Sequence, residues 1–142
     1  MEDDKKMEEE IKMKHLEFIQ SIITRMNTNS FQIKSWAVAI VSALLALYAD
    51  SEKIYYIYLA IFPTLIFGLL DAYYLHQERK YRELYNKVIQ KESKVGLFDL
   101  NAKDYKKGLL EYFKALFSRT IAPLYGCIIV ALIIAGIIAR YY

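Results

Sequence analysis

The sequence predicts an all-α integral membrane protein with three transmembrane helices and a small helical cytoplasmic base. Of the 142 residues, 56% are apolar although 25% are charged, and the apolar ones gather in three long stretches. These stretches, 31–49, 54–75 and 120–139, measure roughly 26 to 33 Å as helices, which matches a hydrocarbon core of about 30 Å. The third stretch has no polar stripe, so a soluble three-helix bundle is the weaker interpretation.

Composition excludes several other classes of protein. The single cysteine, Cys127, rules out a disulfide scaffold. A formal charge of +3 is too small for a protein that coats nucleic acid. With 13 Tyr and 7 Phe, the chain is too aromatic to be mainly disordered. A folded membrane protein is the remaining class.

Residues 1–30 are expected to form an N-terminal amphipathic cytoplasmic helix. Apolar side chains recur at helical spacing over residues 4–27. They are Met7, Ile11, Phe18, Ile22 and Met26, with Leu16, Ile19 and Ile23 beside them. The polar run 27–30 then interrupts this pattern, and we expect it to cap the first membrane helix. A hinge and a polar contact site are the alternatives.

Residues 31–75 are expected to form a transmembrane hairpin with spans 31–49 and 54–75. Lys34 and Asp71 are the charges within these spans, and the short connection places them at similar depth. Because a charge at that depth is costly unless paired or hydrated, we expect either an ion pair or snorkelling to the headgroups. Ser35 and Ser42 share a face with small alanines, which suits close helix packing or a hydrated pore. The aromatic second span is expected to face lipid.

Residues 76–119 are expected to form a cytoplasmic helical segment. The second span continues as a polar helix to Glu92, and a turn around Gly96 follows. A second amphipathic helix is expected from Asn101 or Asp104 to residue 118. Residues 120–142 supply the third transmembrane helix and a short outer tail.

The flanking charges predict the orientation of the spans. Lys and Arg number five in residues 1–30, one in 50–53, eleven in 71–119 and one in the tail. Basic flanks favour the cytoplasm, so the N-terminus and segment 76–119 are expected there and the C-terminus outside.

The basic and aromatic helix after the second span is the main candidate for a ligand site. Cations can hold phosphates while tyrosine rings stack on bases. The candidate ligand-binding residues are Arg79, Lys80, Tyr81, Arg82, Tyr85 and Lys87. Composition alone favours contact with anionic lipid instead.

No catalytic chemistry, cofactor or metal site is predicted. His15 and His76 lack metal-ligand partners in the sequence, and His15 is expected to face a partner. No nucleophile elbow or phosphate-cradling glycine loop is present. We therefore expect a protein that is not an enzyme.

Two stretches carry a resemblance to a known family. They are residues 18–36, with Arg25-Met26-Asn27-Thr28-Asn29-Ser30-Phe31-Gln32-Ile33-Lys34-Ser35-Trp36, and residues 70–82, with Leu70-Asp71-Ala72-Tyr73-Tyr74-Leu75 and Gln77-Glu78-Arg79. Together they resemble the membrane effectors of Hailong-type antiphage defence systems. The resemblance covers about half of the chain. It also extends to the broader class of short pore-forming effectors, from which the third span here departs.

This resemblance implies an oligomeric channel-forming effector in a bacterial inner membrane, with a tetramer as the implied assembly. The implied partners are a nucleotidyltransferase-like enzyme of the same system and a nucleotide or short single-stranded DNA bound at the cytoplasmic face. Lys34, Ser35, Ser42 and Asp71 are the expected pore and gating residues. The alternative is a regulatory or structural membrane protein that forms no channel and recruits a cytoplasmic partner through its N-terminal helix.

Overall fold

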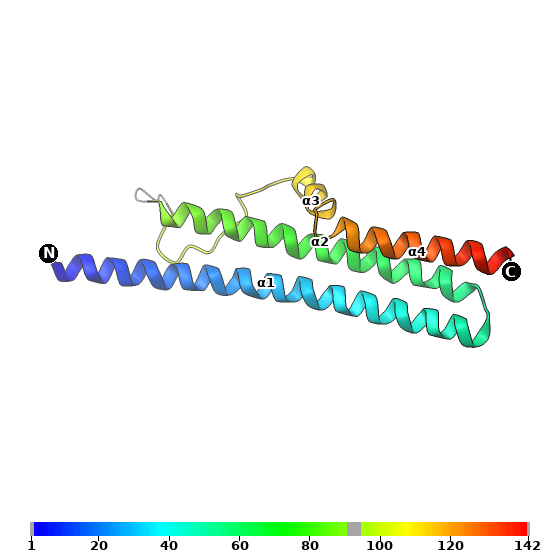
Figure 1. Ribbon diagram of the computed structural model, residues 1–142. Helices are drawn as coiled ribbons and strands as arrows, with labels where there is room; N and C mark the ends of the chain where they lie inside the picture. The colour runs from blue at the N-terminus through cyan, green and yellow to red at the C-terminus, as the bar shows by residue number, and fades with distance from the viewer. Residues whose placement is uncertain (1, 91–94, 142) are drawn as a thin grey trace.

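A computed structural model describes residues 2–90 and 95–141, and its regular elements are four helices (Figure 1). Helix α1 covers Glu2–Ser51 and α2 covers Tyr55–Ile89. The short α3 covers Leu109–Leu116 and α4 covers Ala122–Tyr141. At about 1.5 Å per residue, α1 is roughly 75 Å long, so it extends far beyond the thickness of a bilayer.

Helices α1 and α2 form an antiparallel hairpin along most of their length (Figure 1). Glu52 ends α1 in the left-handed conformation, with φ at 57°, and its N–H donates to the Tyr48 carbonyl at 2.7 Å. A left-handed residue after the last turn is a common way to satisfy the free carbonyls of a helix end. The chain then reverses within three residues into α2.

Helix α2 is the central helix of the protein. It packs against α1 on one side and against α3 and α4 on another (Figure 1). The expectation that the second span faces lipid is therefore only partly right. One face of α2 stays exposed, with Phe62, Leu65 and Leu69 on it, while Ala60, Thr64 and Ala72 are buried between helices.

Three apolar clusters hold the helices together along their length. The cluster farthest from the hairpin turn contains Ile19, Ile23, Leu84, Val88 and Ala102. The middle cluster contains Ala37, Ala72, Ile121 and Tyr125, and the one nearest the turn contains Val41, Ile57, Ala60 and Leu132. The buried residues of α1 recur at steps of four and seven, which is typical of one seam along a packed helix.

Helix α1 does not break at residues 27–30, so the predicted cap there is wrong. Helix α1 continues through these four polar residues from its charged N-terminal part into its apolar part. Ser30 is buried and its hydroxyl donates to Asp71 of α2. Ser30 therefore forms a polar contact between helices, which was one of the alternatives, and does not cap a helix.

The predicted helix over residues 104–118 is shorter than expected, since α3 covers only Leu109–Leu116. Residues 95–108, here called the strap, cross the α1–α2 pair before α3 begins (Figure 1). Asp99 and Asn101 accept backbone N–H groups two residues on, and such local bonds compete with a helix. Gly108, with φ at 100°, then turns the chain into α3.

The strap is attached to α1 through His15, which was expected to face a partner. Its Nε2 lies 3.1 Å from the Asp99 carbonyl, and its ring lies 5.8 Å from that of Phe98. Ala102 completes the attachment by filling the cluster around Ile19. His15 therefore serves the fold of its own chain. The expected end of the polar helix at Glu92 lies outside the described residues.

Three helices, α1, α2 and α4, are each long and apolar enough to cross a membrane. They cover the three predicted spans except for Ile54 at the start of the second and residues 120–121 at the start of the third. The fold is therefore compatible with a membrane location, in which the outer parts of α1 and α2, with the strap, form a stalk beyond the apolar region.

Candidate functional site

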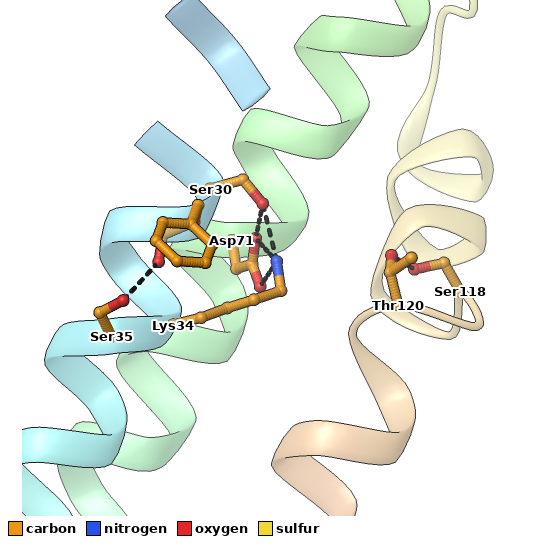
Figure 2. A network of polar contacts seen from close by, with 7 residues as sticks. Ser30, Lys34, Ser35, Asp71, Ser118 and Thr120 are labelled. Atoms are coloured by element: carbon orange, nitrogen blue, oxygen red, sulfur yellow. Dashed lines mark hydrogen bonds and ion pairs between the residues drawn. The ribbon is translucent and has the colours of Figure 1, made fainter. Parts of the chain in front are cut away.

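A buried polar network joins α1 to α2 near one end of the apolar region (Figure 2). Lys34 Nζ lies 2.6 Å from Asp71 Oδ2 and 2.8 Å from Oδ1. Ser30 donates to the same Oδ1, and Lys34 Nζ lies 2.7 Å from the Ser30 hydroxyl. The three side chains are thus joined to one another by hydrogen bonds as well as by the ion pair.

The two charges differ in their access to solvent. The Asp71 side chain is 0% exposed, whereas that of Lys34 is 23% exposed. A buried carboxylate without a partner is strongly destabilising, and Lys34 supplies that partner across the two helices. Of the two expectations for these charges, the ion pair describes this structure better than snorkelling does.

Ser35 and Ser42, the other two expected pore residues, do not join this network. Both lie on the exposed side of α1, and Figure 2 shows Ser35 pointing away from α2. The Ser35 hydroxyl donates to the Phe31 carbonyl at 3.1 Å. Ala39 and Ala46, on the same face, are exposed as well.

The six candidate ligand residues of α2 lie in different surroundings in the structure. The rings of Tyr81 and Tyr85 pack against the cluster around Ile19 and Leu84, so they are not open platforms for bases. Arg82 Nε lies 2.7 Å from Glu78 Oε1. Lys80 and Tyr81 line a pocket, and neither Arg79 nor Lys87 is part of its lining.

That pocket lies where α1, α2 and the strap meet, and its volume is about 570 Å³. Its lining combines cations, tyrosines and amides: Arg25, Met26, Asn29, Tyr73, Tyr74, Gln77, Lys80, Tyr81, Leu100, Asn101, Ala102 and Lys103. Within the described ranges no carboxylate lines it. Most of this site could not be predicted from the sequence, because its residues come from three separate segments.

Three cations from three segments converge on the pocket. Arg25 comes from α1, Lys80 from α2 and Lys103 from the strap. None of their side chains forms an ion pair with a residue of the described ranges. The Asn101 side chain accepts the Lys103 N–H at 3.1 Å, which fixes the local conformation of the strap before Lys103.

This chemistry suits an anion that carries an aromatic or polar base. Unpaired Lys and Arg bind phosphate groups, and tyrosine rings offer stacking surfaces. Tyr73 is about half exposed and its ring lies edge-on to that of Tyr74, at 5.6 Å. The amides of Asn29 and Gln77 add groups that can donate to and accept from a base.

The pocket also lies next to the buried ion pair. Asn29, which lines the pocket, precedes Ser30 in α1, and Tyr74 lies one turn beyond Asp71 in α2. A ligand that moves α1 against α2 at the pocket would therefore act directly on the contact between Ser30 and Asp71.

The described residues contain no cluster of side chains that could bind a metal ion. No group of three or more His, Cys, Asp or Glu side chains is close enough there to hold an ion. The candidate site is therefore the pocket with its three cations, together with the adjacent ion pair.

Comparison of this chain with known proteins finds no matching family model, no matching curated protein and no matching solved structure. The resemblance to Hailong-type effectors therefore stays an expectation that rests on the two quoted stretches.

Proposed function

We propose that this protein is one subunit of an oligomeric membrane channel whose state is set by a nucleotide or short oligonucleotide. The observation that supports this proposal best is the pocket of Arg25, Lys80 and Lys103, next to the buried pair of Lys34 and Asp71. The cations would hold the phosphates, and exposed Tyr73 would stack on a base. The setting that the resemblance implies is antiphage defence, with a nucleotidyltransferase-like enzyme supplying the ligand.

Gating requires that the ligand bind the open and closed states with unequal affinity. The pocket supports such a difference because its three cations sit on three segments. If α1 shifts against α2, the distances between Arg25 and Lys80 change, and so does the fit of a multiply charged ligand. The same shift would strain the bond between Ser30 and Asp71, which lies one turn closer to the membrane.

A pore in this proposal forms between subunits. Three helices that lie side by side, with α2 in the middle, leave no room for a pore within one copy. The face of α1 with Ser35, Ala39, Ser42 and Ala46 is exposed, and its small polar side chains suit either a close contact between copies or a hydrated lining. A tetramer is the assembly that the resemblance implies.

Ligand binding is tested with the full chain in nanodiscs and a fluorescent four-nucleotide single-stranded DNA, with ATP as a second probe. The variant changes Arg25, Lys80 and Lys103 to Gln. The control changes Lys5, Lys6 and Lys87 to Gln, which removes the same charge away from the pocket. We expect only the pocket variant to lose binding, and equal loss in both variants would contradict the site.

Channel formation is tested by ion flux through liposomes that contain the protein, with and without the DNA probe. We expect the probe to change the flux of the wild type and not that of the pocket variant. Flux that stays at the level of empty liposomes in every condition would contradict the channel.

The alternative is a regulatory membrane protein that forms no channel and recruits a cytoplasmic partner. Met7 and Phe18 favour it, since they are 61% and 53% exposed on the outer part of α1. The double substitution Ser35→Leu and Ser42→Leu distinguishes the channel from the recruiting protein. That change should block a hydrated pore but leave recruitment through the N-terminal part of α1 unaffected.

A further inference from the structure

Helix α3 turns an apolar face away from the rest of the protein. Tyr112, Ala115 and Leu116 pack toward α2 and the middle cluster. The opposite face carries large apolar side chains that are 43% to 75% exposed: Leu109, Leu110, Phe113 and Phe117. A helix in water does not leave such a face uncovered, so this face has an occupant.

The position of α3 along α2 indicates what that occupant is. The Tyr112 hydroxyl donates to the Leu69 carbonyl at 2.8 Å, and its ring lies edge-on to His76. Exposed Tyr55 and Tyr73 mark the two ends of the apolar part of α2. They are separated by about 27 Å along the helix, close to the hydrocarbon thickness of a bilayer. Helix α3 therefore lies at the level of the lipid headgroups.

The charges around α3 favour an anionic surface. Residues 103–119 contain five cations and two acidic residues. Lys107 and Lys114 have neighbouring carboxylates as partners, whereas Arg119 forms no ion pair with a described residue. A short apolar face with a basic rim is the chemistry of a helix that lies in the interface of an anionic membrane.

An apolar groove of about 420 Å³ opens between α2 and the corner that joins α3 to α4. Gly68 and Gly126 form part of its walls, and a Cβ at Gly126 would meet only open space. Leu65, Leu116 and Ile121 line it, and the Thr64 hydroxyl is already bonded to the Ala60 carbonyl. A hydrocarbon chain fits this lining better than any polar ligand.

We propose that α3 and the corner after it form a binding site for an anionic phospholipid. One acyl chain lies in the groove between Leu65 and Ile121, and the exposed face of α3 lies at the boundary of headgroups and chains. Arg119, which lies in the chain between the groove residues Phe117 and Ile121, holds the phosphate, and Lys106 adds positive charge before the start of α3. This site depends on the membrane location of the protein, but not on channel formation or on the nucleotide pocket.

The depth of α3 is tested with single tryptophans in a Trp36→Phe background, using the full chain in nanodiscs of phosphatidylcholine and phosphatidylglycerol. Phe113→Trp reports on α3. Val130→Trp, on the exposed face of α4, is the control within the bilayer, and Leu97→Trp, on the strap, is the control in water. We expect acyl-chain bromine to quench positions 113 and 130 but not 97, and iodide to quench 97 alone.

Two results at position 113 would overturn the proposal. Quenching by iodide and not by bromine would place α3 in water. Protection from both quenchers would mean that protein, such as a second copy of the chain, covers the face. Absence of bromine quenching at position 130 would instead overturn the membrane location, and the lipid site with it. None of these measurements depends on ion flux.

The headgroup is tested by placing the bromine on a small fraction of either lipid. We expect brominated phosphatidylglycerol to quench Phe113→Trp more than brominated phosphatidylcholine does. The double variant Lys106→Gln and Arg119→Gln should make quenching by the two brominated lipids equal. The control variant Lys5→Gln and Lys6→Gln should leave the difference in quenching unchanged. Equal quenching by both lipids in the parent protein would overturn the anionic preference.

Discussion

Lys34 and Asp71 form an ion pair across α1 and α2, with Nζ 2.6 Å from Oδ2, near the place where the apolar part of both helices ends. The pair lies between the pocket of Arg25, Lys80 and Lys103 on one side and the apolar helices on the other. In the proposed function, it is the contact through which a change in the pocket would reach the apolar part of the protein.

Removing Lys34 should destabilise the protein more than neutralising Asp71 does. Lys34→Met leaves a carboxylate that is 0% exposed without its partner, which costs about 3–5 kcal/mol for a buried pair. Asp71→Asn keeps an acceptor for Ser30 and leaves a Lys34 that is partly exposed, so about 1–3 kcal/mol is expected. Thermal unfolding in detergent measures both, with the exposed Ser35→Ala as the control. The reverse order of stabilities would contradict the pairing described here.

Exchanging the two charges tests the pair directly. Lys34→Asp and Asp71→Lys should each lose stability and probe-dependent flux, because each places like charges together. The double exchange should regain part of both losses. A double variant as impaired as the sum of the single variants would show that each residue acts alone.

Binding of the single-stranded DNA probe should weaken steeply with salt. Three cations that neutralise phosphates give a slope of about −2 for log K against log salt concentration, since each contributes roughly 0.7 for a single strand. Changing Lys103 alone to Gln should reduce the slope by about 0.7. Fluorescence anisotropy at several salt concentrations measures it. A slope unaffected by Lys103→Gln, but reduced by Lys87→Gln, would move the site to the outer face of α2.

His15→Ala should loosen the strap without unfolding the helices. The change removes the hydrogen bond to the Asp99 carbonyl and the contact with Phe98, and together these are worth about 1–3 kcal/mol. Hydrogen exchange of amides 97–105 should accelerate by about tenfold for each 1.4 kcal/mol lost. The neighbouring exposed Lys14→Ala is the control. Unchanged exchange in His15→Ala would mean that Ala102 alone holds the strap.

The packing of α3 should weaken in mild acid. Burial lowers the pKa of His76, and Lys80 and Arg79 lower it further, against an opposing effect of Glu111. The unfolded chain therefore binds a proton that the folded chain does not, so the stability that neutral His76 contributes is complete above pH 6.5 and is lost as the pH falls from there through the lower pKa of the folded state. Thermal unfolding at pH 7.5 and 5.5 should show this loss, and His76→Gln should reduce it. An equal loss in the variant would assign the effect to another group.

The local sequence pattern was sufficient to predict the three apolar helices. The three spans and the long polar continuation of α2 follow from charge-free stretches of bilayer length and from helical periodicity, which depend only on neighbouring residues. The short hairpin turn also places Lys34 and Asp71 at similar depth, but the sequence left an ion pair and snorkelling as alternatives, and the helix packing decided for the pair.

The tertiary structure decided the rest. Residues 27–30 stay helical because Ser30 finds a partner in Asp71, 41 positions away in the chain. The strap replaces part of a predicted helix because Ala102 fills a cluster made by α1 and α2. Tyr81 and Tyr85 turn inward for the same reason. Arg25, Lys80 and Lys103 meet only through this packing, so periodicity along the sequence could not bring them together.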